Sequence, residues 1–322
     1  MRFSLLPSTV FLDVQGEDCV RYLNARLTND IKQLPVGEAI SAAALSPQGR
    51  TEGFFKVLRV DPFHFFLLCA GGDPVEVKKA LSRFMVADRV AVQDFSDSHS
   101  ALHVFKESDN PSKILDIISN CVDAKSIERF KGSFLAKDPL TAAFCSTRTK
   151  WKGVDLIVNR ELIDNVMDTL VKMGGERIEG AHVEFLRISA GVPAFPVEIN
   201  GDFLFSEVLV DGVISKTKGC YVGQEIVERI SSRGKSPYLI LPFLFNAKVA
   251  QLTPGTQVEV SLVKANKVEQ ELELGTIVSV GRLLDKTAAF IRLKNRGSDL
   301  QYTARFEEIV GESIDPTSYG NR

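Results

Sequence analysis

The first two thirds of the chain alternate between short apolar runs and amphipathic segments. Between about residues 53 and 95 the order is strand, turn, strand, helix and closing strand, and the same order recurs between about 143 and 180. Apolar residues cluster or alternate in the predicted strands and recur every three to four positions in the predicted helices. Each unit is too small to bury both faces of its sheet alone. We therefore expect two related α+β (ferredoxin-like) units that pack together.

After residue 237 the helical period disappears. β-rich runs follow one another, separated by turns that contain proline, glycine or asparagine, and this pattern predicts a small antiparallel β-barrel or sandwich. We expect an α+β region over 1–237, with discontinuous lobes around 1–50 with 143–237 and around 51–142, followed by a barrel over 238–322. The runs expected to form barrel strands are 239–245, 257–264, 272–280 and 288–293.

Local signals mark several helix starts and turns. Asp73 is followed by a proline and, three residues on, by Glu76, which is the arrangement of a capped helix start. Asp18 precedes apolar residues at helical spacing, so we expect it to cap a helix as well. The polar run at 28–30 predicts a turn. With Asn24 it could also supply groups of a site, although the local pattern favours the turn.

Composition and charge narrow the class of protein. A chain of 322 residues with 44% hydrophobic and 25% charged residues is typical of a globular protein of two or three domains. The net charge of −2 gives no general attraction to nucleic acid or membranes. No apolar run approaches the roughly 18 residues of a membrane span, and the N-terminus lacks the pattern of a secretory signal. We expect a cytoplasmic protein.

The five cysteines are scattered and contain no Cys-x-x-Cys pair. This usage is typical of a reducing compartment and argues against a disulfide framework or a self-contained zinc or Fe–S site. His99 and His103 are four residues apart, but they lie in or beside a predicted strand, so we expect no metal site there. The cysteines are Cys19, Cys69, Cys121, Cys145 and Cys220.

Residues 216–235 hold the densest group of chemically active and small residues. Gly219 and Gly223 flank Cys220, and we expect both glycines to allow positive φ and close backbone approach. A short helix is predicted to begin near Gln224, and its first amides would favour an anion or a thiolate. Cys220 beside basic residues could therefore be a nucleophile or metal ligand, or it could be a small core residue. The basic residues of this patch, which could make a local contact with nucleic acid, are Lys216, Lys218, Arg229, Arg233 and Lys235.

This stretch resembles a family signature. Lys218-Gly219-Cys220-Tyr221-x-Gly223-Gln224-Glu225-x-x-x-Arg229, followed by Arg233-Gly234, resembles the signature of the YgfZ family at every fixed position. These are folate-binding proteins related to the T-protein (aminomethyltransferase) of the glycine cleavage system. The relatives that transfer aminomethyl groups usually lack the cysteine, so Cys220 separates the two branches.

The resemblance extends to two other stretches. Residues 16–50 are similar to the opening of the same superfamily, and Leu186-Arg187-x-x-Ala190-Gly191-x-Pro193 is similar to the segment that runs along its folate cavity. Two positions depart from the pattern. Ser189 stands where an acidic residue often contacts the pterin ring, and Val183 stands where some members place a tryptophan.

The resemblance implies the aminomethyltransferase fold, with the two α+β units around a central folate cavity and a C-terminal barrel. It implies an accessory protein that binds tetrahydrofolate or a one-carbon derivative and supports Fe–S cluster assembly or repair in client enzymes, including enzymes of tRNA modification. On this interpretation Cys220 supplies a thiolate, and Lys218 and Arg229 keep it ionised or hold the folate glutamate. The remaining motif residues that would shape the loop are Gly219, Tyr221, Gly223, Gln224 and Glu225, and the expected folate contacts are Glu198, Glu207 and Asn24.

Two other functions stay open from the sequence. A tetrahydrofolate-dependent aminomethyltransferase would use folate as one-carbon acceptor, and both Cys220 and Ser189 count against it. A nonenzymatic tRNA-binding protein would depend on the basic patch alone. Whether the chain has catalytic turnover of its own is not indicated by the residues.

Overall fold

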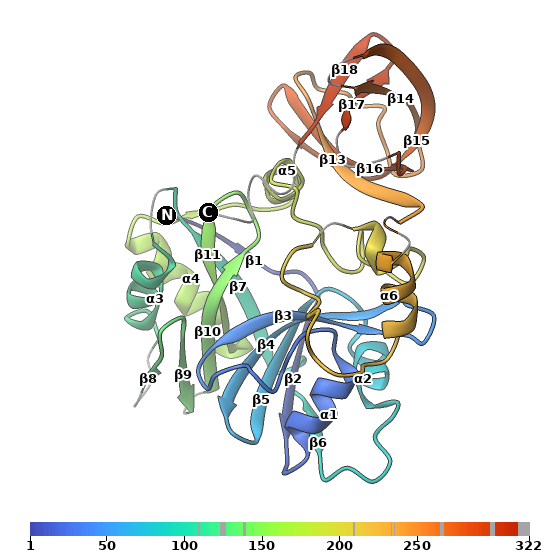
Figure 1. Ribbon diagram of the computed structural model, residues 1–322. Helices are drawn as coiled ribbons and strands as arrows, with labels where there is room; N and C mark the ends of the chain where they lie inside the picture. Colours follow the sequence, from blue (N-terminus) through green and yellow to red (C-terminus); the bar gives the residue numbers. More distant parts are fainter. Residues whose placement is uncertain are drawn as a thin grey trace. The chain divides into compact units, whose positions relative to one another are not determined.

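The computed structural model describes residues 1–107, 110–122, 127–137, 140–208, 210–232, 234, 236–264, 267–296 and 300–314. The chain forms two compact units, each made of two stretches of sequence (Figure 1). Unit 1 comprises Met1–Ile178 and Gly212–Gln224, and unit 2 comprises Glu179–Asp211 and Glu225–Arg322. The segment that carries Cys220 therefore belongs to unit 1, although it lies far along the sequence.

Unit 1 contains a five-stranded antiparallel sheet in the order β3-β4-β5-β2-β6 (Figure 1). Helix α2 packs against β2, β4 and β6, and the Tyr22 hydroxyl of α1 donates to the Leu81 carbonyl of α2. The elements are β2 (Thr9–Gln15), α1 (Cys19–Arg26), β3 (Ala39–Leu45), β4 (Thr51–Asp61), β5 (His64–Ala70), α2 (Pro74–Ser82) and β6 (Ala91–Asp94).

The second sheet of unit 1 has seven strands in the order β12-β1-β7-β11-β10-β9-β8. Its pairs are antiparallel except for β1 with β12, which are parallel. Helix α3 packs on β7, β9, β10 and β11, and α4 packs on β12. The elements are β1 (Arg2–Leu5), β7 (His99–Phe105), α3 (Pro111–Ser119), β8 (Ile127–Arg129), β9 (Ser133–Lys137), β10 (Leu140–Thr147), β11 (Lys152–Asn159), η1 (Arg160–Leu162), α4 (Ile163–Lys172) and β12 (Glu176–Arg177).

The predicted repeat of hairpin, helix and strand is confirmed. It occurs as β4-β5-α2-β6 in the first sheet and as β10-β11-α4-β12 in the second. Asp73 caps α2 as predicted, because its carboxylate accepts a hydrogen bond from the Glu76 amide at 3.0 Å. Asp18 precedes α1 but makes no side-chain cap, since its carboxylate accepts from the Arg89 amide instead. The helix was predicted correctly, and its cap was not.

One apolar core joins the two sheets of unit 1. Phe11, Leu58 and Phe66 of the first sheet pack in the same cluster as Phe144 and Ile157 of the second, and all five are almost fully buried. The rings of Phe11 and Phe66 lie 5.1 Å apart between centroids. Each sheet thus covers the other, as expected for units too small to bury both faces alone.

Unit 2 consists of short helices and a closed six-stranded antiparallel barrel in the order β13-β16-β15-β14-β17-β18. The predicted C-terminal barrel is confirmed, but its last two strands were not predicted. Helix α5 packs against β13, β15 and β16. The elements are α5 (Ala181–Ser189), η2 (Phe205–Glu207), α6 (Gln224–Ser232), β13 (Tyr238–Phe245), β14 (Gln257–Lys264), β15 (Lys267–Leu283), β16 (Lys286–Lys294), β17 (Leu300–Phe306) and β18 (Ile309–Ser313).

The boundaries in the structure differ from the predicted domains. In unit 1 the first sheet is built from strands between residues 9 and 94, and the second from residues 2–5 and strands between 99 and 177, whereas the prediction placed lobe boundaries near 50 and 142. Residues 179–211 and 225–237 group with the barrel rather than with the α+β region. In the part of the chain that the structure describes, no helix is both long enough and apolar enough to cross a membrane.

Candidate functional site

Cys220 is the exposed cysteine of this protein. Cys19 and Cys69 are buried, and the other two cysteines are half-buried. Burial raises the pKa of Cys19 to about 11 and that of Cys69 to about 12, so these thiols resist ionisation in the folded protein. A thiol that reacts or binds metal must ionise and be reached by its partner. Cys220 meets the requirement of access, as the sequence interpretation requires.

The segment 212–224 that carries Cys220 is attached to the residues that follow helix α1. The Thr28 hydroxyl donates to the Val213 carbonyl at 2.7 Å, and the Ser215 amide donates to the Thr28 carbonyl at 3.1 Å. The Asn29 side-chain amide donates to the Gly212 carbonyl at 2.7 Å. The polar run at 28–30 therefore forms a turn and also supports the Cys220 segment.

Lys218 is buried, and its ammonium group points at main-chain oxygens. It donates to the carbonyls of Asn24 and Leu27 and, at 2.8 Å, to the carbonyl of Asn29. Burial lowers the pKa of Lys218 to about 8, and the nearby charge of Asp30 offsets part of this effect. The sequence indicated no such contacts, and the role of Lys218 at a thiolate or at folate stays a prediction.

The two glycines beside Cys220 differ. Gly223 has φ of +85°, and a Cβ there would lie 2.6 Å from the Ser46 carbonyl oxygen and 2.9 Å from the Leu45 side chain. The prediction of positive φ and close approach is confirmed at this position. At Gly219 it is wrong, because φ is not positive and a Cβ would meet no atom within 4 Å. Of these two glycines, only Gly223 is closely approached by another segment.

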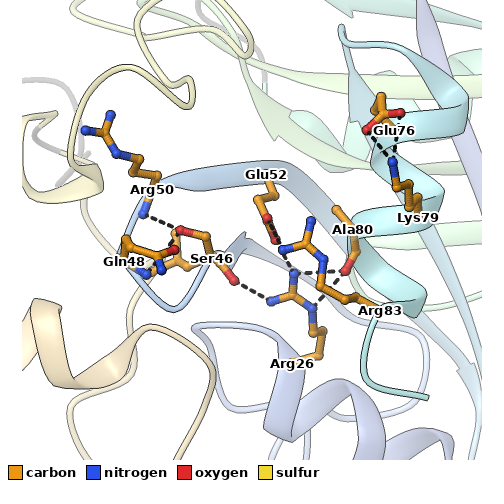
Figure 2. Close-up of polar contacts among 10 residues, drawn as sticks. Arg26, Ser46, Gln48, Arg50, Glu52, Glu76, Lys79, Ala80 and Arg83 are labelled. Atoms are coloured by element: carbon orange, nitrogen blue, oxygen red, sulfur yellow. Dashed lines mark hydrogen bonds and ion pairs between the residues drawn. The ribbon is translucent and has the colours of Figure 1, made fainter. Parts of the chain in front are cut away.

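Gly223 closely approaches the turn between β3 and β4. A buried arginine bonds to the end of the strand that leads into this turn (Figure 2). The Arg26 guanidinium, in the last turn of α1, donates to the Leu45 carbonyl at 2.6 Å and to the Ala80 carbonyl of α2 at 2.9 and 3.0 Å. It also pairs with Glu52 at 2.7 Å, and Glu52 pairs in turn with Arg83. Sequence reasoning missed Arg26 and Glu52. The available signal was that Arg26 lies three residues after an apolar position of the helix.

The turn itself is held by its own serine. The Ser46 hydroxyl oxygen accepts from the amides of Gln48 at 3.2 Å and Arg50 at 3.3 Å (Figure 2). In the close-up the Arg50 side chain points away from the Arg26 cluster. The carbonyl of Ser46 is thereby fixed where Gly223 approaches it.

Tyr221 and the start of α6 complete the motif. Tyr221 is buried, and the Lys218 ammonium lies 5.1 Å from the centroid of its ring. The Val222 amide donates to the Ala25 carbonyl at 3.2 Å. Helix α6 begins at Gln224, as predicted. The residue after Cys220 is therefore packed inward while Cys220 itself is exposed.

The structure describes three of the five residues of the predicted basic patch. Arg229 pairs with Glu225, one turn earlier on α6. Lys218 is buried on its carbonyl oxygens, and Lys216 is exposed. The two outer members, Arg233 and Lys235, lie outside the described residues. A tRNA contact through this patch stays a prediction.

Glu198 is fully buried inside unit 2. Its carboxylate accepts hydrogen bonds from Arg187 at 2.8 and 3.1 Å, from the Ala194 amide at 2.8 Å and from the Ser279 hydroxyl. Both oxygens are occupied, which connects α5 to the barrel strand β15. The sequence did not predict this role. The expected pterin contact of Glu198 stays a prediction, and a pterin would have to compete with these hydrogen bonds for the carboxylate.

Glu207 also has an arginine partner. It is buried and accepts from Arg292 at 2.7 Å. The guanidinium carbon of Arg292 lies 3.9 Å from the ring centroid of Tyr238 and 5.2 Å from that of Phe203.

Asn24, the third expected folate contact, uses its side-chain oxygen to accept from the amides at 31 and 32, at 3.0 and 3.4 Å. For both Glu207 and Asn24 a structural role is visible, and the predicted folate contact stays a prediction.

His99 and His103 are buried in unit 1. His103 is bonded through Nδ1 to Asp155 at 2.8 Å, and Arg148 pairs with the same carboxylate. Burial alone would raise the pKa of Asp155, but the Arg148 charge and the His103 hydrogen bond outweigh it and hold the pKa well below its usual range. Across the described ranges, no group of three or more histidine, cysteine, aspartate or glutamate side chains could hold a metal ion.

Comparison with known proteins fixes the fold. No family model matches the chain. A protein of Haemophilus influenzae strain Rd, described only as uncharacterized, is 24% identical over 266 residues, covering 81% of this chain and 79% of that protein. The crystal structure of glycine cleavage system aminomethyltransferase T from Bartonella henselae superposes with a TM-score of 0.68 over 98% of this chain and 85% of that one.

The fold is that of aminomethyltransferase T. The predicted fold class is confirmed: mixed helices and sheets in ferredoxin-like units, with a closed C-terminal barrel. The two sequences are only 14% identical, so the likeness establishes the fold and no more. Heterotetrameric sarcosine oxidase from Corynebacterium sp. U-96, in complex with pyrrole 2-carboxylate, has a TM-score of 0.36 over 55% of this chain and 87% of that one, at 13% identity. That match is too weak to carry an argument.

Proposed function

We propose that this protein binds tetrahydrofolate or a one-carbon derivative of it and supports the assembly or repair of Fe–S clusters in client enzymes, including tRNA-modifying ones. The observation that carries the proposal is the exposed thiol of Cys220, on a segment attached to a scaffold with the fold of aminomethyltransferase T. The fold supports a folate partner, because a relative with this fold acts in the glycine cleavage system. The resemblance to the YgfZ signature supports the role of the thiol.

The chemistry of Cys220 limits what the protein does alone. A single thiolate holds an Fe–S cluster only when the remaining ligands come from elsewhere. The described part of the chain offers no second group of ligands. On the proposed function, Cys220 therefore acts on a cluster or sulfur atom that a client or carrier protein also binds, and the cluster is cargo rather than a resident cofactor.

The main alternative is a tetrahydrofolate-dependent aminomethyltransferase. The fold shared with aminomethyltransferase T is compatible with this alternative, as it is with the first proposal. The cysteine in the motif and Ser189 in place of an acidic residue count against it. In the structure the Ser189 hydroxyl donates to the Leu186 carbonyl within its own helix, at 3.2 Å.

Two measurements test the proposal. Calorimetric titration of the full-length protein with tetrahydrofolate should show binding, and a chain that does not bind reduced folates would contradict the folate half of the proposal. Cys220→Ala should bind folate as the wild type does, yet fail to restore Fe–S enzyme activity in a strain that lacks the protein.

The matched control is Cys121→Ala, which removes a half-buried thiol and should restore activity fully. Full rescue by Cys220→Ala would make the exposed thiol dispensable and refute its role. Turnover in a glycine cleavage assay with the lipoyl carrier would favour the aminomethyltransferase instead. Binding of tRNA without any folate binding would favour the nonenzymatic tRNA-binding protein.

A further inference from the structure

We propose that Lys218 is a positioning residue: by binding the carbonyls at the end of α1 it fixes the segment 212–224 and thus where the Cys220 thiol is presented. The importance of that placement rests on the proposed function of Cys220. The placement itself is a property of unit 1 that can be tested without folate, clients or clusters.

The end of α1 is built to accept a cation. The last carbonyls of a helix have no partner within the helix, and the aligned peptide dipoles place partial negative charge there. The carbonyls of Asn24, Leu27 and Asn29 converge on the Lys218 nitrogen. An ammonium group has three N–H donors and no acceptor, so these three oxygens occupy its full bonding capacity.

The same contacts argue against direct activation of the thiol by Lys218. A lysine that stabilises a thiolate by a direct hydrogen bond must point an N–H at the sulfur, and in this structure carbonyl oxygens take all three. Lys218 is 9% exposed, whereas Cys220, two residues later, is exposed. The charged groups that act on the ammonium are Asp30 and Lys32, which oppose each other. Lys218 therefore acts on Cys220 through the backbone.

The segment is held on both sides of the thiol. Lys218 attaches it before Cys220, while the Val222 amide and the close approach of Gly223 to Ser46 attach it afterwards. Gly219 and Cys220 lie exposed between these anchors, and nothing lies within 4 Å of the Gly219 side-chain position. Without Lys218 the nearest attachment before Cys220 is the hydrogen bond from the Ser215 amide to the Thr28 carbonyl, so a longer stretch around the thiol lacks an anchor.

The test measures loop protection and thiol reactivity separately in the full-length protein. Amide hydrogen exchange is followed by mass spectrometry on peptides covering 213–222. Alkylation of Cys220 by iodoacetamide is followed at the peptide level from pH 6 to 9.5. The variants are Lys218→Met, Lys218→Arg and the matched control Lys216→Met, which removes an exposed lysine from the same segment.

If Lys218 positions the segment, Lys218→Met should speed amide exchange in 213–222 by about tenfold or more. The reason is that local opening of the variant has no ammonium contacts to break. The pH at which alkylation reaches half its maximal rate should stay where it is in the wild type. Lys216→Met should change neither quantity, and Lys218→Arg, which keeps charge and donors, should recover part of the protection.

A shift of that half-maximal pH to higher values with unchanged exchange would show that Lys218 acts by its charge, and would overturn the proposal. Unchanged exchange and unchanged alkylation would overturn it as well. If Lys218→Met does not fold, loss of protection in Lys218→Arg relative to Lys216→Met decides the question. None of these outcomes depends on folate binding, so failure of the proposed function remains distinguishable.

Discussion

The buried guanidinium of Arg26 provides the sharpest test of how the site is supported. In Arg26→Met the apolar stem is kept, but the donors to Leu45, Ala80 and Glu52 are lost. Glu52 retains Arg83 as a partner, so the main cost is two buried carbonyls that lose a charged donor. At about 1–3 kcal/mol for each group left without its bond, we expect unit 1 to lose about 2–6 kcal/mol of stability.

The assay uses a built-in reporter. Trp151 is the single tryptophan of the sequence and lies in unit 1, so its fluorescence follows the unfolding of that unit in urea. With a slope of about 2 kcal/mol per molar urea, the expected loss moves the midpoint down by about 1–3 M. The control is Arg21→Met on the same helix. The Arg21 side chain is 64% exposed and pairs with Asp88. An exposed ion pair contributes about 0–1 kcal/mol, so the control should shift far less.

Arg26→Met and Arg21→Met should differ clearly in their urea midpoints. Equal midpoints for Arg26→Met and Arg21→Met, at an unchanged slope, would mean that the carbonyls of Leu45 and Ala80 find other donors or that the region relaxes at little cost. A lower midpoint with a changed slope would instead report an altered unfolded or partly folded state, and hydrogen exchange in β3 and α2 would then have to show the local loss.

Three further outcomes are expected. Gly223→Ala should weaken the hydrogen-exchange protection of its segment, since a non-glycine residue at positive φ costs about 1–2 kcal/mol even before the clash with Ser46. Gly219→Ala should leave this protection unchanged. Equal effects of the two variants on hydrogen exchange would contradict the assigned geometry. Cys220 should be alkylated in the native protein while Cys69, with its pKa raised to about 12, reacts only after unfolding, as peptide mapping will show. Because the pKa of Asp155 is depressed in the folded state, its stabilising contribution is present above the ordinary aspartate range and is lost as pH falls through the lower folded value. The stability difference between the wild type and Asp155→Asn should therefore shrink between pH 6 and pH 3, and a difference that grows on acidification would be inconsistent with the assigned pairing.

Sequence patterns predicted the features that depend on neighbours along the chain. The repeated hairpin, helix and strand, the barrel, the Asp73 cap and the start of α6 at Gln224 all follow from local periodicity or short motifs. Gly223 was predicted for the right reason, because close approach and positive φ both require glycine. The parallel argument failed at Gly219, where neither condition applies.

The partners of the buried charges could not be predicted. Lys218 bonds to the carbonyl of Asn24 across 194 positions of sequence, and Glu207 pairs with Arg292 across 85. Such pairs form only when the tertiary fold brings distant segments together, and a single sequence carries no record of which acid meets which base. Glu198 illustrates the consequence, since a carboxylate expected at a ligand proved to be enclosed with Arg187. The domain boundaries were not predicted for a related reason. The hydrophobic pattern of consecutive residues does not show that the segment 212–224 belongs to the same unit as residues 1–178.

The fact that residues 212–224 complete unit 1 has a consequence for folding during synthesis. Residues 1–178 leave the ribosome well before residues 212–224, yet the carbonyls at the end of α1 receive their cation only from the later piece. A nascent or truncated chain ending at residue 178 must therefore leave these oxygens to water, and the thiol joins its support only once the intervening stretch has been made. No uninterrupted fragment that stops short of residue 224 contains all of unit 1.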